Sequence, residues 1–260
     1  MEENPFLVNF YKENDESTRF KRSKGTNVEF ETTMHYIKKY LKPNCKILEL
    51  GASTGNYSIP LAKMGYDVTA VELLDENLDV LKQKSKKLKN ITPIKANALD
   101  LSQFKDNTFD LVLSLGPMYH LYTKKDDKKA INEAIRVCKK GGILFFAYLT
   151  HSSVIFYEGV VKNNFKNIGY AINDKGEAKN SPEEIFSSHF CDEFENYFKD
   201  LKVKKLNHVA TDGLATCCRT FFDNLSKKDY ETFLRWHFST CERTDQLGWS
   251  SHVLFICKKM

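Results

Sequence analysis

Short apolar segments alternate with longer amphipathic segments over roughly residues 45–150. The apolar segments have the length and composition of buried strands; they are residues 45–50, 67–71, 91–94, 109–114 and 143–148. The intervening segments have helical periodicity; they are residues 56–64, 76–88 and 126–138. This alternation predicts βαβ units and a mostly parallel sheet. Gly141 and Gly142 are expected to stop the helix 126–138.

The flanking regions extend this core at both ends. Residues 201–210 and 251–258 read as strands, and the residues between them have helical character. We therefore expect an α/β fold: a doubly wound, mostly parallel seven-stranded sheet with helices on both faces, an antiparallel last strand and a helical cap. The expected divisions of this single compact domain are an N-terminal helical cap segment 1–40, a Rossmann-like core 41–150, and the remainder 151–260 with a helical insertion at about 211–245.

Composition narrows the class of protein. The chain has 260 residues, 39 Lys and Arg against 34 Asp and Glu, and a formal net charge of +5. Its lysines alternate with acids, as in residues 124–129, which favours a solvated surface over a nucleic-acid groove. The longest strongly apolar run, 143–148, is far shorter than the roughly 20 residues that span a bilayer. With no signal-like N-terminus, we expect a cytoplasmic protein without membrane or specific nucleic-acid partners.

The cysteines carry no recognisable metal or disulfide pattern. There are seven, an odd number, with no CxxC pair and no Cys/His spacing of the zinc-finger type. We expect reduced thiols and no metal site.

Residues 47–56 have the pattern of a strand, a glycine-containing turn and a helix start. Gly51 and Gly55 permit backbone angles and close ligand approach that a side chain would prevent. Ser53 stands where a dinucleotide-binding GxGxxG loop has its middle glycine. Glu72 follows Gly55 by 17 residues, at the end of the next expected strand, where a carboxylate can accept both hydroxyls of a ribose.

Taken together, these motifs resemble class I S-adenosylmethionine (SAM)-dependent methyltransferases. The segment 49–55 is similar to the glycine loop of that family, and Glu72 to its ribose-binding acid. The further matching segments, in chain order, are 95–99, 108–114 and 137–144. Leu115-Gly-Pro-Met-Tyr-His-Leu121, with Tyr11, Arg19 and residues 29–33, resembles a bacterial subgroup that has small-molecule-type caps.

The resemblance implies SAM as cofactor and assigns residues around it. Gly51, Ser53 and Gly55 would bracket the methionine portion, and Glu49 would help to hold its ammonium group. Glu72, followed by Leu73, would bind the ribose.

Asn97 replaces the usual aspartate of the family, but its amide oxygen can still accept from adenine. Ala98 and Leu99 would face the adenine ring, and Leu115 and Gly116 would pass close to the sulfonium. Tyr11 and Arg19 would reach across from the N-terminal segment, with Arg19 facing the cofactor carboxylate.

Methyl transfer from a sulfonium is an in-line displacement that needs alignment, worth about 7–11 kcal/mol, and no metal ion. His120 is the candidate base, and the alternative is a histidine that bonds a loop carbonyl. Tyr119 would line the acceptor pocket or pack on the N-terminal helix. We expect this pocket to be formed by residues 116–122, the N-terminal helices and the helical insertion.

The expected activity is methyl transfer to a small molecule, and two alternatives stay open. A nucleic-acid or protein methyltransferase is the first, although Gly116-Pro-Met-Tyr119 lacks the polar lead of base-methylating enzymes and no cysteine follows a proline. A non-catalytic SAM-binding regulator is the second. The sequence leaves the acceptor and the oligomeric state open.

Overall fold

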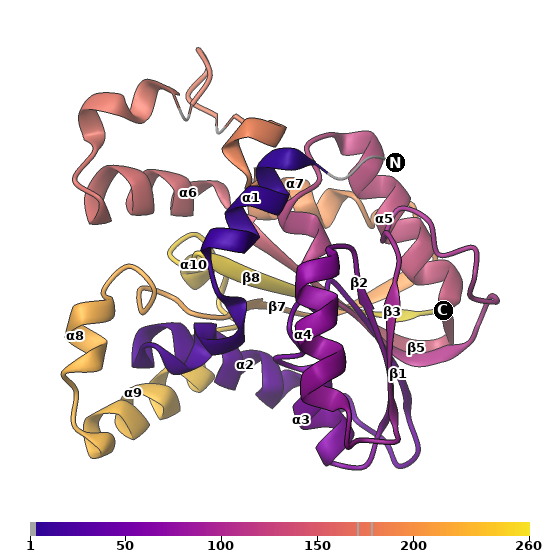
Figure 1. Ribbon diagram of the computed structural model, residues 1–260. Helices are drawn as coiled ribbons and strands as arrows, with labels where there is room; N and C mark the ends of the chain where they lie inside the picture. The colour runs from indigo at the N-terminus through magenta and orange to yellow at the C-terminus, as the bar shows by residue number, and fades with distance from the viewer. Residues whose placement is uncertain (1–3, 171, 178) are drawn as a thin grey trace.

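The computed structural model describes residues 4–170, 172–177 and 179–260, and its centre is one twisted sheet (Figure 1). The strands are β1 Lys46–Leu50, β2 Asp67–Glu72, β3 Ile91–Lys95, β4 Phe109–Ser114, β5 Cys138–Thr150, β6 Ser188–His189, β7 Val203–Ala210 and β8 His252–Lys259. Their order is β3-β2-β1-β4-β5-β8-β7, with the two-residue β6 beside β5. The first five strands run parallel, and β8 runs antiparallel to both β5 and β7.

The expected fold class is confirmed, with the short β6 as an addition to the seven expected strands. Strand order reverses between β1 and β4, which start consecutive halves of the sheet. In open α/β sheets, ligands bind beyond the carboxyl ends of the strands at such a reversal. The fold therefore directs attention to the residues that follow β1, β2, β3 and β4.

The helices follow the amphipathic segments and the flanks. They are α1 Pro5–Glu13, α2 Lys24–Tyr40, α3 Ser58–Lys63, α4 Asp75–Ser85, α5 Lys124–Val137, α6 His151–Val154, α7 Cys191–Asn196, α8 Arg219–Asp223, α9 Lys227–Thr240 and α10 Thr244–Leu247. Short 3-10 turns lie at η1 Glu16–Lys21, η2 Pro117–Tyr119, η4 Phe165–Tyr170 and η5 Pro182–Glu184, and a π-helical stretch at η3 Ile155–Val161. In the core, α3 packs on β2, α4 on β2 and β3, and α5 on β4 and β5.

The junction between α5 and β5 differs from the expected one. The helix ends at Val137, and β5 begins at once with Cys138, so Gly141 and Gly142 lie inside the strand. The pairing of β5 with β4 shifts register there, and Gly141 has φ +79°. A Cβ on Gly142 would lie 2.9 Å from the carbonyl oxygen of Asp110. The two glycines therefore permit the irregularity in β5. Such an irregularity needs the same backbone freedom as the end of a helix.

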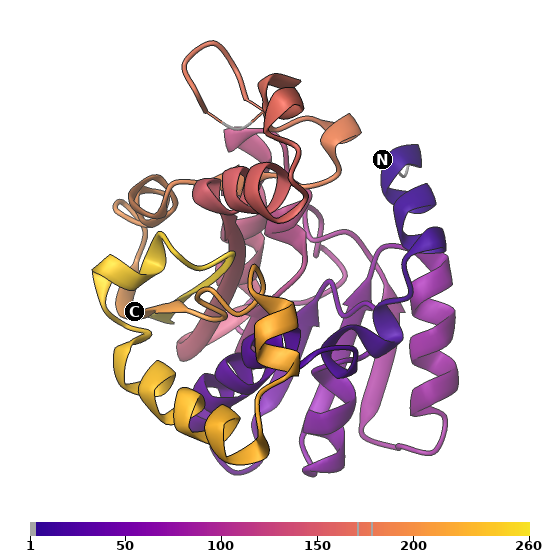
Figure 2. The ribbon, with the colours of Figure 1, turned by 90° about the vertical axis from the view of Figure 1, so that its left-hand side faces the viewer.

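Two lobes stand beside the carboxyl-end edge of the sheet. We call residues 151–170 the upper lobe and residues 211–249, which include α8, α9 and α10, the lower lobe. Figure 2 shows them above and below an opening, with the N-terminal segment alongside. The lower lobe connects β7 to β8, and α8 packs against α2.

Candidate functional site

A cavity of about 310 Å³ lies at the carboxyl ends of β1–β4, under α1. Most of the residues that the sequence predicts for the cofactor line it. They are Tyr11, Gly51, Ser53, Glu72, Leu73, Asn97, Ala98, Leu99 and Gly116, together with the catalytic candidate His120. The fold thus brings together side chains from five separate stretches of the chain.

The loops after β1 and β4 meet at Gly51 and Gly116. A Cβ on Gly51, where φ is +71°, would lie 2.9 Å from the Cα of Gly116. A Cβ on Gly116 would lie 2.9 Å from the carbonyl oxygen of Gly51. Backbone atoms cannot move aside as a flexible side chain can, so both positions require glycine. This close approach sets the shape of the cavity floor.

Glu72 connects the ends of β1 and β2. Its Oε2 accepts from the Ser53 amide at 2.7 Å, and its Oε1 accepts from the Leu74 amide at 2.9 Å. Burial raises the pKa of Glu72, and these amide donors lower it. Each carboxylate oxygen keeps one lone pair for a further donor. The hydroxyl of Ser53 is buried and has no hydrogen-bond partner among the described residues.

The loop after β3 forms the next wall. Asn97 Oδ1 accepts from the Leu99 amide at 2.9 Å, and Ala98 and Leu99 are buried. The amide nitrogen and one oxygen lone pair of Asn97 are thus left for a ligand, beside two apolar side chains.

Glu49, Gly55 and Leu115 are near this cavity but do not line it. Glu49 is buried in β1 and accepts from the hydroxyl of Ser58. Burial raises the pKa of Glu49 to about 8, although the bond from Ser58 lowers it. A Cβ on Gly55 would lie 2.6 Å from Leu81, so this glycine lets α3 and α4 approach. The predicted contacts of these three residues with a cofactor have no direct support from the geometry.

His120 is held at both ring nitrogens. Its Nδ1 lies 2.9 Å from the carbonyl oxygen of Ile185, which can only accept, so Nδ1 carries the proton. Its Nε2 then accepts from the hydroxyl of Tyr11 at 2.9 Å. Burial lowers the pKa of His120 to about 4. The alternative of a carbonyl-bonded histidine matches this geometry, and the role of His120 as a base stays a prediction.

The wall opposite the glycine loop includes residues that the sequence did not indicate. Asn4 and Pro182 line the cavity together with Tyr122, whose hydroxyl donates to Ile185 O at 2.8 Å. The amide side chain of Asn4 reaches toward both Tyr122 and Pro182, at 3.4 Å each. No residue of the helical insertion 211–245 lines this cavity, so the expected contribution of the insertion to an acceptor pocket stays a prediction. No pattern in the sequence indicates that residues 182–187 return to this cavity, because they follow a long irregular segment.

Arg19 lies outside the cavity lining, in a group of charged side chains. Its Nη2 donates to Glu29 Oε2 at 2.7 Å and lies 3.0 Å from His252 Nε2. His252 Nδ1 lies 2.8 Å from Asp212 Oδ2. We call Arg19, Glu29, Asp212 and His252 the charged cluster. The predicted contact of Arg19 with a cofactor carboxylate has no support here, because Glu29 already pairs with the guanidinium.

Tyr119 is also directed to the charged cluster. Its ring packs edge-on against His252, with centroids 5.8 Å apart, and it does not line the cavity. Burial raises its pKa, and the charge of Glu29 raises it further. Glu29, Asp212 and His252 come from three distant segments, and no sequence motif indicated a role for them beyond the resemblance at 29–33.

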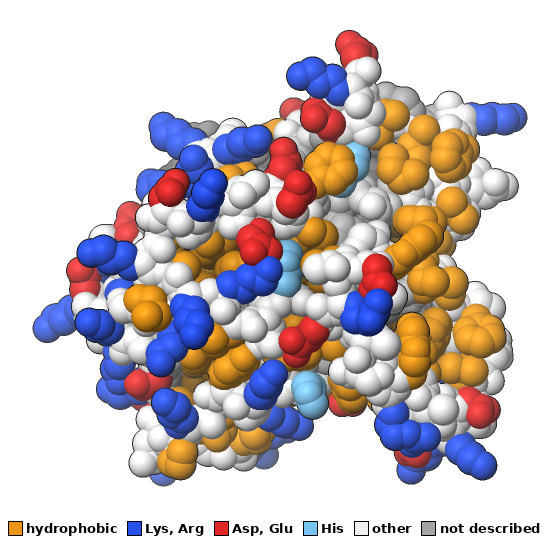
Figure 3. Space-filling view, turned by 180° about the vertical axis from the view of Figure 1, so that it is seen from behind, with side chains coloured by type: hydrophobic (Ala, Val, Ile, Leu, Met, Phe, Trp, Pro, Cys, Tyr) orange, Lys and Arg blue, Asp and Glu red, His pale blue; other side chains and the backbone are white. Residues whose placement is uncertain are grey.

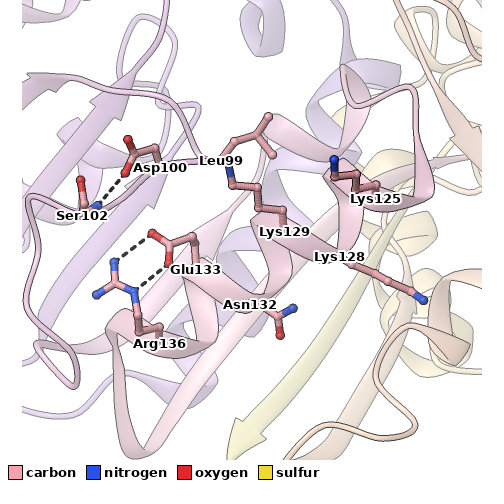
Figure 4. A pocket seen from close by; sticks show the side chains of 9 residues that line it. All are labelled: Leu99, Asp100, Ser102, Lys125, Lys128, Lys129, Asn132, Glu133 and Arg136. Carbon is pink, nitrogen blue, oxygen red and sulfur yellow. Dashed lines mark hydrogen bonds and ion pairs between the residues drawn. The ribbon is translucent and has the colours of Figure 1, made fainter. Parts of the chain in front are cut away.

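A second, more open hollow of about 870 Å³ lies along α5 (Figure 4). Lys125, Lys128 and Lys129 line it from the helix, and residues 99–102 line it from the other side. Glu133 and Arg136 at its end are paired with each other at 2.7 Å. The hollow contains no residue of the glycine loop and shares only Leu99 with the cavity.

In the part of the chain that the structure describes, no group of three or more His, Cys, Asp or Glu side chains is placed to hold a metal ion. No helix there is long and apolar enough to cross a bilayer. All seven cysteines are free thiols.

The strand order and the loops that meet at this cavity are those of a Rossmann-like α/β fold. Residues 48–146 match the family model described as a methyltransferase domain. Over 110 residues the chain is 38% identical to a demethylmenaquinone methyltransferase of Renibacterium salmoninarum, covering 42% of this chain and 43% of that protein. The chain spans about half the length of the curated relatives it matches.

Solved structures share the fold over most of the chain. The PH0226 protein of Pyrococcus horikoshii superposes with a TM-score of 0.62 at 17% identity, covering 97% of this chain and 99% of that one. A SAM-dependent methyltransferase of Methanosarcina mazei superposes with a TM-score of 0.57 at 17% identity, covering 86% and 97%. At these identities the likeness establishes the fold.

Proposed function

We propose that this protein is a SAM-dependent methyltransferase that transfers a methyl group to a small-molecule acceptor without a metal ion. The observation that carries the proposal is the convergence of Gly51, Glu72, Asn97 and Gly116 on one cavity. They lie at or just after the carboxyl ends of β1, β2, β3 and β4, at the reversal of strand order. The matched methyltransferase domain covers the same four residues.

The residues present fit this cofactor chemically. The free lone pairs of Glu72 suit two neighbouring ribose hydroxyls. Asn97, Ala98 and Leu99 offer a polar edge and apolar faces to an adenine. The buried hydroxyl of Ser53 has no partner among the described residues, and a ligand in the glycine loop would supply one.

When bound, SAM supplies an already activated methyl group. The protein's own contribution is then orientation and the exclusion of water. The Gly51–Gly116 contact fixes two loops against each other, and α1, tied down through Tyr11 and His120, covers the cavity. Small acceptors are favoured because the cavity is narrow and the lysines are distributed over the surface. The demethylmenaquinone methyltransferase similarity supports the same substrate class.

Calorimetry tests the cofactor assignment. We expect SAM and S-adenosylhomocysteine to bind at micromolar levels and NAD not to bind. Glu72→Ala should weaken binding by about 1.5–3 kcal/mol, the range for charge-assisted hydrogen bonds. Asp67→Ala is the matched control, because it removes an exposed acid from the other end of β2 and should leave affinity unchanged. Binding of NAD without SAM would overturn the assignment.

Turnover separates an enzyme from a SAM-binding regulator. We expect S-adenosylhomocysteine to form when SAM and the protein are incubated with a small-metabolite extract. Tight binding without product across such extracts would favour the regulator, and activity only on RNA, DNA or protein would overturn the small-molecule acceptor.

A further inference from the structure

The charged cluster joins three distant parts of the chain at the carboxyl-end edge of the sheet. Arg19 lies in η1 and Glu29 in α2. Asp212 is the second residue after β7, and His252 is the first residue of β8. Asp212 is fully buried: its Oδ1 accepts from the hydroxyl of Ser250 at 2.6 Å and from the His252 amide at 3.0 Å. A carboxylate that is buried in this way needs an opposite charge or hydrogen-bond donors beside it.

The charges in this cluster do not balance. Arginine only donates, so His252 Nε2 accepts from Arg19, and its Nδ1 donates to Asp212; the imidazole is therefore neutral. Glu16 lies 3.8 Å from the other guanidinium nitrogen of Arg19, and burial raises its pKa. Two carboxylates, those of Glu16 and Glu29, thus lie against one guanidinium, and a third, that of Asp212, pairs with the neutral His252. The cluster therefore carries excess negative charge, which favours a cationic ligand.

Two polar atoms at the cluster have no partner within the described chain. Glu29 uses Oε2 for Arg19, and its Oε1 accepts no hydrogen bond. Tyr119 is 5% exposed, and its hydroxyl makes no hydrogen bond. Both residues contact His252, Glu29 at 3.6 Å and Tyr119 through its ring. Neither atom is completely shielded from solvent, so both unpaired atoms, which share one place, are accessible to a ligand.

This place adjoins the reacting end of the proposed cofactor site. Tyr119 follows Gly116 by three residues in η2, and the Tyr119 amide donates to the Gly116 carbonyl at 3.2 Å. The side chains of Arg19 and His252 are 28% and 13% exposed, so the cluster reaches solvent. An acceptor can therefore reach it from outside.

The notch between the two lobes provides an apolar approach on the same side. Figure 3 shows it from behind, with hydrophobic side chains on both lobes. Phe165 of the upper lobe is 58% exposed, and Phe221 and Trp249 of the lower lobe are 64% and 51% exposed. Phe156 and Trp249 pack across the lobes with centroids 5.4 Å apart.

We propose that the acceptor is an amine, whose nitrogen binds between Glu29 Oε1 and the Tyr119 hydroxyl and whose apolar body lies in the notch. This inference rests on the proposed methyltransferase function. The amine arrives as an ammonium ion and releases one proton to water. Its lone pair then forms the new bond to the methyl carbon, the carbon–sulfur bond breaks, and its electron pair stays on sulfur. The product ammonium remains matched to the carboxylates.

Oxygen and carbon acceptors fit this cluster less well. A hydroxyl or a carbon acid becomes strongly nucleophilic as an anion, which Glu29 and Asp212 would repel. The nearest histidine, His252, has its basic nitrogen occupied by Arg19, so it is not free to take a proton. A neutral amine attacks without an adjacent base, which agrees with the groups present.

Ligand-detected NMR and calorimetry on the full chain with bound S-adenosylhomocysteine test this inference. The probes are 2-phenylethylamine and tryptamine, each compared with the alcohol of the same carbon skeleton. We expect at least one amine to bind tenfold more tightly than its alcohol. Glu29→Gln should abolish that preference, and Tyr119→Phe should weaken amine binding about fivefold without changing S-adenosylhomocysteine affinity.

Tyr119→Phe removes only a hydroxyl that has no partner within the described chain, so the variant should fold as the parent does. Tyr66→Phe, in the turn between α3 and β2, is the matched control and should change nothing. Equal binding of amines and alcohols across the panel, or unchanged amine affinity in Tyr119→Phe, would overturn the amine assignment. Failure of S-adenosylhomocysteine itself to bind would instead overturn the proposed function.

Discussion

At the scale of single residues, the polar atoms of this site divide into those that hold the protein together and those left for ligands. Glu72 accepts hydrogen bonds from the backbone amides of Ser53 and Leu74, and Asn97 accepts one from that of Leu99, which fixes the direction of both side chains. The hydroxyl of Ser53 is buried and has no partner in the described chain, and the hydroxyl of the buried Tyr119 makes no hydrogen bond there. Because an unmade bond in the interior costs about 1–3 kcal/mol, such atoms mark where a ligand contributes most.

The Gly51–Gly116 contact yields a prediction at this scale. Gly116→Ala places a Cβ 2.9 Å from a carbonyl oxygen and 3.1 Å from a Cα, so the two loops must separate. We expect SAM affinity measured by calorimetry to fall at least tenfold and stability to fall by about 1–3 kcal/mol, the usual cost of overpacking. Gly248→Ala, with no neighbouring atom within 4 Å, is the control. Unchanged affinity in Gly116→Ala would show that the loops can separate freely.

Roles of single residues were predictable where local pattern determines them. Gly51 needs a positive φ and Glu72 ends a strand, and both properties can be read from neighbours in the chain. Glu29, Asp212 and His252 could not be found this way, because their relation depends on tertiary contacts between residues far apart in the chain, such as that of Glu29 with His252. Arg19 shows the same limit, since its pairing with Glu29 is a tertiary contact.

At the scale of elements, hydrophobic period located the strands and helices well. Buried parallel strands such as β4 are nearly continuous in apolar residues, so the pattern itself is unambiguous. The start of β5 was not predicted. A glycine pair after a helical segment is compatible both with the end of the helix and with an irregularity in the strand that follows. The return of residues 182–187 to the cavity was missed as well, since an irregular segment has no period.

The attachment of α1 gives a prediction about an element. Tyr11→Phe removes the hydroxyl that donates to His120 and leaves a buried ring nitrogen without that partner. We expect a loss of about 1–3 kcal/mol and faster hydrogen exchange in residues 5–13, measured by mass spectrometry, with α5 unchanged. Phe6→Leu, on an exposed position of the same helix, is the control. Equal protection of α1 in both variants would mean that Tyr11 does not hold the helix.

At the scale of the whole molecule, buried titratable groups of opposite preference set the response to pH. Burial lowers the pKa of His120, His189 and His208 to about 4 each. It raises the pKa of Glu49 to about 8 and that of Asp127 to about 7. In the unfolded chain, histidine titrates near pKa 6.5 and these carboxyls near 4. Folded and unfolded states therefore bind different numbers of protons on both sides of neutrality.

These differences predict a stability maximum near pH 6.5. As pH falls from about 6.5 to 4, three histidines take up protons in the unfolded chain but not in the native state, so the stability of the native state falls. The raised pKa values of the two carboxyls oppose this fall only in part. As pH rises above about 6.5, the native state must release protons from Asp127 and then Glu49, which the unfolded chain released already, so stability falls again. Melting temperatures measured from pH 4.5 to 8.5 should show this maximum. Glu49→Gln should flatten the alkaline side, whereas His35→Gln, at an exposed position, should leave the profile unchanged. A melting temperature that rises steadily to pH 8.5 in the parent protein would mean that Glu49 is ionised in the native state.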